Sequence, residues 1–184
     1  MLFETPINLN MKDAEVMYYP DFFTKKEALY YFSDLLKNIN WQQDSITVYG
    51  KKHLQPRLTS FFANNNKDYS YSNIIMTPYP FEGSLQKIKK HIEKKLGINF
   101  TSCLANLYRD GNDSNGWHAD DEKELGTNPI IVSISFGAER AFRFKHKHDN
   151  TLKRKLGLEN GSLLLMKGKT QDNWFHQVPK TRKK

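Results

Sequence analysis

The sequence predicts an α+β fold in which two helices accompany a double sheet or barrel of the jelly-roll type. Helical periodicity is confined to two segments, and most of the remaining chain alternates polar and apolar residues, as strands do. The 184 residues include 12 Phe, 9 Tyr and 3 Trp, which excludes a disordered chain and suffices for one core. We therefore expect residues 1–184 to form a single domain.

Each predicted helix carries a sequence signal at one of its ends. The first covers residues 25–39 and follows Thr24, a favourable N-cap. The second follows Ser84 as its N-cap and stops at Gly97, a residue type that readily ends helices. The lysines of the second helix form a solvated face in the favoured interpretation, and a phosphate-facing role is the alternative.

Short segments with a period of two predict about eight strands, separated by Gly, Asn, Asp and Pro. These segments are residues 45–49, 57–62, 69–74, 100–108, 130–136, 141–145, 162–166 and 173–178.

The composition of the chain indicates which kind of partner it binds and in which compartment it is found. The formal net charge of +8 favours a polyanionic partner, although charge alone is weak evidence. A single cysteine, Cys103, excludes an internal disulfide framework and a cysteine zinc site. No apolar stretch is long enough to span a membrane, and residues 1–10 do not resemble a secretory signal. We expect an intracellular protein, in the cytoplasm or, in a eukaryote, the nucleus.

The tripeptide His118-Ala119-Asp120 is the strongest local signal of chemistry. On a strand, residues i and i+2 share a face, so His118 and Asp120 can bind one ion. His176, on a predicted strand near the end of the chain, is the best candidate for a third ligand. Two histidines and one carboxylate are typical of non-haem Fe(II) oxygenases, in which the remaining coordination positions stay open.

Spacing alone leaves other interpretations open. His-x-Asp tripeptides arise by chance, and His53, His91, His146 and His148 are further candidates by residue type. His91 falls on the lysine-rich helix, where solvation is expected. His146 and His148 are flanked by lysines in a predicted loop, where a surface or phosphate-contacting role is favoured.

Longer motifs add to this interpretation. In chain order they are Asn106-Leu-Tyr-Arg, Gly116-Trp-His-Ala-Asp-Asp-Glu, Pro129-Ile-Ile-Val-Ser-Ile-Ser-Phe-Gly-Ala, Phe142-Arg-Phe-Lys-His-Lys, Gly161-Ser-Leu-Leu-Leu-Met and Trp174-Phe-His-Gln-Val-Pro-Lys. Together they resemble the AlkB-type Fe(II)/2-oxoglutarate dioxygenases, especially the branch that repairs alkylated bases in duplex DNA. Upstream, Gln55-Pro56-Arg57 and Tyr69-Ser-Tyr-Ser fit the same family.

The resemblance implies a double-stranded β-helix (jelly-roll) core with N-terminal helices packed on one face. Residues 1–100 would supply a substrate-recognition lid and supporting helices, and residues 101–184 the catalytic core. His118, Asp120 and His176 would bind the iron and be the catalytic residues.

The resemblance assigns the co-substrate 2-oxoglutarate to Asn106 and Tyr108. Without it, these residues would be an ordinary inward-facing Asn and Tyr on a core strand. It assigns the substrate to five residues: Tyr49 as an aromatic wedge in the duplex, Tyr69 and Tyr71 as walls around the flipped base, Glu122 at the base edge, and Arg57. Without the resemblance, Tyr49 would be an exposed hairpin tyrosine and Glu122 a solvated loop carboxylate. Tyr69 and Tyr71 would be ordinary sheet packing.

The implied activity is oxidative dealkylation of N-alkylated bases, a demethylation that repairs DNA damage, with Fe(II), 2-oxoglutarate and O2. The implied partner is DNA, duplex or single-stranded, with RNA as a further candidate, and the chain would be a monomer. The competing hypotheses are a catalytically inactive nucleic-acid-binding relative and a dioxygenase that acts on a protein or lipid.

The sequence departs from the family pattern at its end. The family ends in a strand reading Arg-x-Asn-x-x-Phe-Arg, whose first Arg anchors the distal carboxylate of 2-oxoglutarate. This chain stops at Lys184, and Arg182 comes too early to fill that role. We expect a truncated active enzyme with weakened 2-oxoglutarate binding, in which Arg143 is the alternative anchor.

Overall fold

The computed structural model describes residues 5–48, 51–65, 69–71 and 74–182. By their internal contacts, these residues fall into two units, one made of residues 5–32 and 114–182 and the other of residues 33–113. In the described ranges, no helix is long and apolar enough to cross a membrane.

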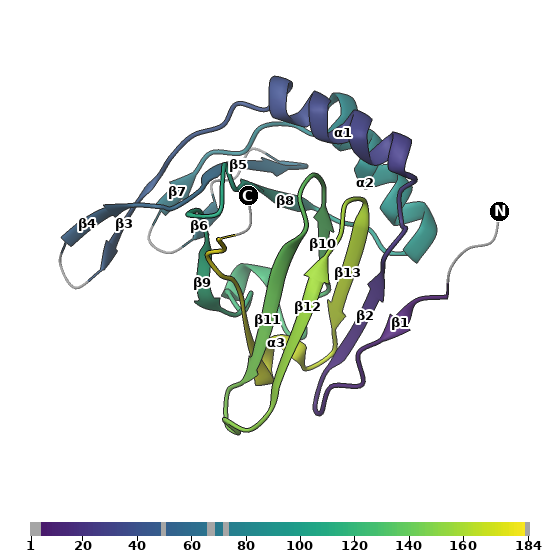
Figure 1. The fold of residues 1–184 in the computed structure, drawn as a ribbon. Coiled ribbons are helices and arrows are strands. Elements are labelled where there is room, and N and C mark those ends of the chain that lie inside the picture. The colour runs from purple at the N-terminus through teal and green to yellow at the C-terminus, as the bar shows by residue number, and fades with distance from the viewer. Residues whose placement is uncertain (1–4, 49–50, 66–68, 72–73, 183–184) are drawn as a thin grey trace. The chain divides into compact units, whose positions relative to one another are not determined.

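The first unit is built from two antiparallel four-stranded sheets (Figure 1). The first sheet has the order β1-β2-β13-β10, with bounds Ile7–Asn8, Glu15–Tyr19, Ser162–Lys167 and Ile131–Ser135. The second has the order β12-β11-β14-β9, with bounds Lys153–Leu158, Arg140–His146, Trp174–Val178 and Asn115–His118. In both sheets, strands far apart in sequence are neighbours, such as β2 with β13 and β9 with β14, as in a jelly roll, so the predicted fold class is confirmed.

Side chains alternate across the second sheet as the pleat requires. On β11, Phe142 and Phe144 are buried whereas Arg143 between them is exposed. On β14, Trp174 and His176 are buried on the same side as the two phenylalanines, whose rings they contact. The inner face of this sheet is therefore aromatic, and it encloses one of the predicted metal ligands.

Helix α1 (Lys25–Asn38) begins with the N-cap that the sequence predicts. The Glu27 N–H donates to Thr24 Oγ1 at 3.2 Å, and the Thr24 N–H donates to Glu27 Oε2 at 2.9 Å, which is a capping box. Ala28 is fully buried, and the rings of Tyr31 and Phe136 lie 5.8 Å apart. The first half of α1 thus packs within the first unit. The short helices η1 (Lys123–Leu125) and α3 (Thr170–Asn173) complete this unit.

The second unit contains the rest of α1, helix α2 (Gly83–Leu96) and three two-stranded sheets. The strand pairs are β3 with β4, β5 with β8, and β6 with β7. Their bounds are Ser45–Val48 and Lys51–Leu54, Leu58–Ala63 and Ser102–Leu107, and Tyr69–Tyr71 and Ile74–Met76. A small core of Phe61, Ala63 and Met76 packs against Leu104 on β8.

Several predicted elements need correction. The predicted strand over residues 69–74 is two strands, β6 and β7, which pair with each other. Strand β12 was missed because its first half, Lys-Arg-Lys, is an exposed edge with no apolar alternation. Helix α2 has Glu82 at its N-cap position, so the prediction of Ser84 was wrong, whereas the stop at Gly97, with φ 68°, is confirmed.

The structure also corrects the interpretation of His146. The sequence favoured a surface loop, but His146 is the buried last residue of β11 and is only 6% exposed. Its Nδ1 accepts the backbone N–H groups of His148 and Asp149 at 3.2 and 3.1 Å, so its imidazole closes the hairpin that follows.

Gly161 gives a test of the packing between α1 and the sheets. Its φ is +83°, and a Cβ at this position would lie 2.9 Å from the Phe23 carbonyl oxygen. We expect Gly161→Ala to lower the free energy of unfolding by roughly 2–4 kcal/mol, since strain and overpacking add.

The matched control for this substitution is Gly97→Ala. Gly97 has a similar φ of +68° but nothing within 4 Å of its Cβ position, so strain alone should cost about 1 kcal/mol. Urea unfolding of both variants measures the difference, and equal losses would contradict the predicted close contact.

Candidate metal centre

Three predicted ligands meet at one end of the second sheet. His118 is the last residue of β9 and stands directly opposite His176 of β14, with ring centroids 4.2 Å apart. Asp120 places Oδ2 3.5 Å from His176 Nε2 and Oδ1 3.8 Å from His118 Nε2. One ligand atom from each residue lies within 4.8 Å of the other two.

Asp120 lies beside His118 as predicted, but strand alternation is not what places it there. Strand β9 ends at His118, so strand alternation does not orient Asp120. Instead, the Asp120 N–H donates to Gln171 Oε1 at 3.0 Å. Gln171 lies on α3, is only 1% exposed, and brings its Nε2 to 3.7 Å from Met166 Sδ. A buried amide therefore fixes the backbone that carries the carboxylate.

Sequence reasoning missed Gln171. Glutamine is neither a usual metal ligand nor a titratable group, so no residue-type signal drew attention to it. The available clue was its place on a short segment immediately before the strand of His176, where a side chain can reach another ligand's backbone.

Both imidazoles are oriented by contacts with their own sheet. His118 Nδ1 lies 2.8 Å from the Gly116 carbonyl oxygen, so Nδ1–H donates there and Nε2 keeps its lone pair. The His176 ring stacks on Phe142 at 5.2 Å with an interplanar angle of 18°. Each histidine thus presents Nε2 toward Asp120.

The electrostatics of the site favour a bound cation. Burial raises the pKa of Asp120 to about 6, and the charge of Asp121 adds to this effect. Burial lowers the pKa of His176 well below its usual value, with further contributions from His118 and Lys147. At neutral pH the carboxylate is charged and His176 is neutral, which are the forms that bind metals. A desolvated carboxylate is stabilised by a divalent ion.

Two imidazole nitrogens and one carboxylate oxygen make a donor set that fits Fe(II). This combination, with other positions open, is characteristic of non-haem Fe(II) oxygenases. The sulfur ligands typical of structural zinc are absent from this cluster.

Glu122, predicted to contact the base edge, lies close to the metal ligands. It precedes η1, and burial raises the pKa of its carboxyl group, as do the charges of Asp120 and Asp121. Its Oε2 is buried and has no hydrogen-bond partner among the described residues.

The predicted co-substrate residues belong to the second unit. Asn106 lies on β8, and Tyr108 follows one residue beyond the end of that strand. Asn106 Oδ1 accepts the Arg57 Nε–H at 2.8 Å, and its Nδ2 donates to the Leu104 carbonyl at 3.2 Å. Arg57 is only 4% exposed and supports Asn106, and its predicted contact with substrate stays a prediction.

The remaining predicted residues have different outcomes. Tyr49 lies outside the described residues. The backbones of Tyr69 and Tyr71 form β6, but their side chains are also outside the described part of the chain. Arg143, the alternative anchor for 2-oxoglutarate, points to the face of β11 opposite Phe142 and His176, so it does not face the metal ligands.

Comparisons with known proteins agree with this fold and donor set. Residues 15–184 match the family profile of the 2OG-Fe(II) oxygenase superfamily. The chain is 39% identical over 176 residues to the human alpha-ketoglutarate-dependent dioxygenase alkB homolog 3, covering 91% of this chain and 61% of that protein. It is 34% identical over 175 residues to the human DNA oxidative demethylase ALKBH2, covering 90% and 67%.

A solved structure, "The structure of OsALKBH1", superposes with a TM-score of 0.67 at 15% identity, covering 96% of this chain and 88% of that one, which supports the fold. The chain therefore belongs to the 2OG-Fe(II) oxygenase superfamily. Within it, the chain is of the AlkB type. It spans about three fifths of the length of the alkB homolog 3 proteins that it matches.

The raised pKa of Asp120 predicts how metal binding depends on pH. Below about pH 6 this carboxyl group holds a proton that a metal must displace, so affinity should fall at least about tenfold per pH unit. Above pH 6 the contribution of Asp120 should level off. Calorimetric titration of Mn(II), repeated at about five pH values between 5 and 7.5, measures the metal affinity as a function of pH. An affinity that does not change between pH 5 and 6 would contradict the assigned ligand.

The hydrogen bond from Asp120 to Gln171 predicts a second effect. Gln171→Leu removes the acceptor and should weaken metal binding about 10–100-fold, as loss of supporting contacts does at other metal sites. Thr170→Val is the matched control, because Thr170 is equally buried on α3 but bonds to Glu15 and Lys167 instead. The control should lose stability and keep its metal affinity. Equal metal affinities for the two variants would show that Gln171 has no positioning role.

Proposed function

We propose that this chain removes alkyl groups from N-alkylated bases of DNA, and of RNA, by oxidation. The observation that carries the proposal is the cluster of His118, Asp120 and His176 on the inner face of a jelly-roll sheet. Family membership supports it, as do relatives named as dioxygenases and as DNA oxidative demethylases. The overall reaction converts an N-methyl group, O2 and 2-oxoglutarate into N–H, formaldehyde, succinate and CO2.

The metal ligands have separate tasks in this proposal. His118 and His176 bind Fe(II) through Nε2, and Asp120 supplies the compensating negative charge. The bound iron, with 2-oxoglutarate and O2, would supply the oxidation of the alkyl carbon. Phe142 stacks on His176 and excludes water from that side, so the imidazole stays neutral and fixed.

Asn106 and Tyr108 would contact 2-oxoglutarate. The hydrogen bond from Arg57 fixes the Asn106 amide, so that its orientation is set before a ligand arrives. The buried guanidinium also places positive charge beside Asn106, which favours a dianionic co-substrate.

Glu122 would contact the damaged base. A buried carboxyl oxygen with no partner is costly, and the polar edge of a base would satisfy it. The carboxylate oxygen of Glu122 can accept a hydrogen bond from an amino group at the base edge. Tyr49, Tyr69 and Tyr71 keep their proposed roles as wedge and pocket walls.

We also propose that the protein acts as a monomer and inside the cell. DNA and RNA are its proposed partners, in agreement with its net charge of +8.

The proposal predicts turnover on a defined substrate. With Fe(II) and 2-oxoglutarate, the protein should convert 1-methyladenine in an oligonucleotide to adenine, forming formaldehyde and succinate in equal amounts. Asp120→Asn should reduce the rate to that of the chelator-treated protein, because the metal loses its charged ligand. His148→Gln is the matched control and should keep its rate, because His148 is exposed and its backbone N–H and ring contact His146, which is not a metal ligand.

Two other outcomes would exclude the proposed function. Succinate formed without adenine would indicate a dioxygenase with another substrate. A metal-loaded protein that binds the oligonucleotide and forms no succinate would indicate an inactive nucleic-acid-binding relative. Chromatographic analysis of the nucleosides, together with succinate measurement, distinguishes these cases.

A further inference from the structure

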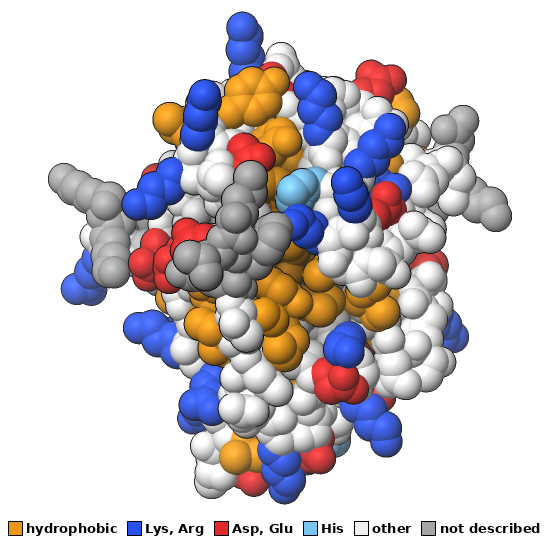
Figure 2. Space-filling model, turned by 90° about the vertical axis from the view of Figure 1, so that its right-hand side faces the viewer, with side chains coloured by type: hydrophobic (Ala, Val, Ile, Leu, Met, Phe, Trp, Pro, Cys, Tyr) orange, Lys and Arg blue, Asp and Glu red, His pale blue; other side chains and the backbone are white. Residues whose placement is uncertain are grey.

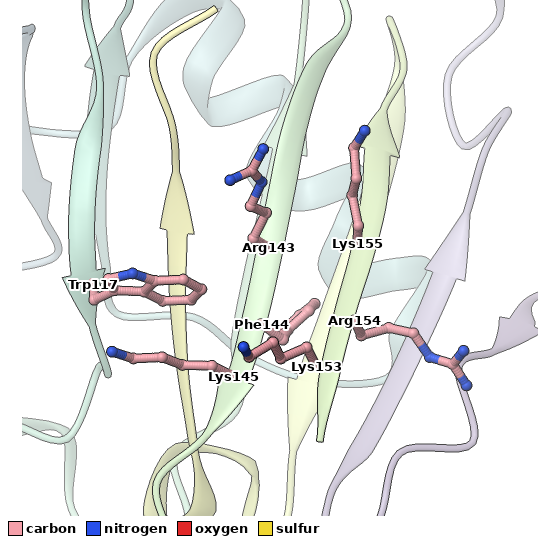
Figure 3. A pocket seen from close by; sticks show the side chains of 7 residues that line it. All are labelled: Trp117, Arg143, Phe144, Lys145, Lys153, Arg154 and Lys155. Carbon is pink, nitrogen blue, oxygen red and sulfur yellow. The ribbon is translucent and has the colours of Figure 1, made fainter. Parts of the chain in front are cut away.

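A basic hollow lies on the outer face of the sheet whose inner face carries the metal ligands. Its volume is about 520 Å³, and its cations come from two neighbouring strands, β11 and β12 (Figure 3). Because Phe142 and Phe144 point inward, Arg143 and Lys145 point outward from β11. The hollow and the metal ligands therefore lie on opposite faces of one sheet.

Positively charged residues face each other directly across the two strands of this hollow. In the β11–β12 register, Arg143 stands opposite Lys155, and Lys145 stands opposite Lys153. Like charges at directly opposite positions destabilise a sheet. The residues that line the hollow include no carboxylate, whereas nearby Lys147 pairs with Asp121 at 2.9 Å. Two like-charged pairs, with no carboxylate among the residues that line the hollow, favour a bound anion.

An aromatic side chain borders the same hollow. Trp117, on β9, is 40% exposed, which is unusual for so large an apolar group. The Lys145 ammonium lies 4.7 Å from the Trp117 ring and 5.4 Å from the Phe175 ring, and so supports the indole from one side. In Figure 3, Arg143 lies on the other side of the indole. A flat group could stack on the ring and face a guanidinium.

Net charge alone does not select this face. Figure 2 shows Lys and Arg side chains distributed over another face of the molecule, interspersed with hydrophobic and acidic groups. The outer hollow differs because it combines paired cations, an absence of lining carboxylates and an exposed indole. An acidic peptide would use the cations but has no general need for an aromatic platform. A nucleic acid strand uses both.

We propose that this hollow binds a single-stranded segment of nucleic acid. Phosphates contact Arg143, Lys145, Lys153 and Lys155, and one base stacks on Trp117. The inference adds to the proposed function a second contact, on the face opposite the metal ligands. A segment bound there flanks the base that is processed, because one nucleotide cannot occupy both faces.

The charge component is tested with the double variant Arg143→Gln/Lys155→Gln. Binding of an unmodified, fluorescein-labelled oligo-dT about 12 nucleotides long is followed by anisotropy over a series of salt concentrations. Loss of two phosphate contacts should lower the slope of log affinity against log salt by about 1.4. The matched control, Lys87→Gln/Lys94→Gln, removes two exposed lysines of α2 and should leave the slope unchanged. The same slope change in both variants would overturn the inference.

The stacking component is tested at Trp117. Oligo-dT should quench the fluorescence of the wild-type protein, and Trp117→Phe should lose this quenching while it keeps most of the affinity. Trp117→Ala should bind about 5–150-fold more weakly, since stacking on an aromatic ring stabilises by ~1–3 kcal/mol per base. Wild-type affinity in Trp117→Ala would overturn the inference. So would a polyglutamate peptide of equal length that binds as tightly as oligo-dT.

Failure of this inference can be told from failure of the proposed function. Oligo-dT carries no alkylated base, so its binding requires no turnover. Arg143→Gln/Lys155→Gln should keep wild-type Mn(II) affinity, because both residues face away from the metal ligands. Oligo-dT binding through the hollow without repair of 1-methyladenine would exclude only the proposed function. Repair without any effect of the hollow variants would exclude only the second site.

Discussion

The antiparallel pairing of β9 with β14 is the constraint on which the metal centre depends. It sets His118 opposite His176, although the two residues are far apart in the sequence. A shift of one residue would turn one imidazole to the outer face, because strand side chains alternate. The aromatic contacts of His176 with Phe142 and Phe144 hold this register, since any slip would also expose the rings packed around it.

The third ligand obeys a different constraint. Asp120 lies beyond the end of β9, where no ladder fixes the chain, and its backbone is held by the side chain of Gln171. The desolvated carboxylate is unfavourable beside Asp121 and Glu122 in the absence of a cation. Pairing therefore positions the neutral ligands, whereas a buried amide holds the charged ligand against electrostatic repulsion. Binding of a divalent ion would relieve that repulsion, which couples metal affinity to local order.

The sequence predicted the jelly-roll class from local patterns, and it predicted the three clustered residues from the His-x-Asp motif together with the family resemblance. Strand β14 alternates buried and partly exposed side chains, strand β13 is a continuous apolar run, and the His-x-Asp motif is compact. The sequence does not reveal tertiary contacts. The motif that assigned Arg57 to substrate gave no sign of its hydrogen bond to Asn106, and its contact with substrate stays a prediction. His146 was assigned to a loop because lysines flank it, yet its ring fills a buried position at the hairpin.

The same alternation that builds the metal centre also determines what lies behind it. On β11 every inward aromatic has an outward neighbour, so Phe142 and Phe144 require Arg143 and Lys145 to face solvent. Solvent exposure alone would be satisfied by any polar residues, including an even mixture of charges. The observed pairing of cation with cation across β11 and β12 costs stability, as does leaving an indole exposed beside them. Features that oppose folding persist when they serve binding, and so the outer face of this sheet, like its inner face, has the properties of a functional surface.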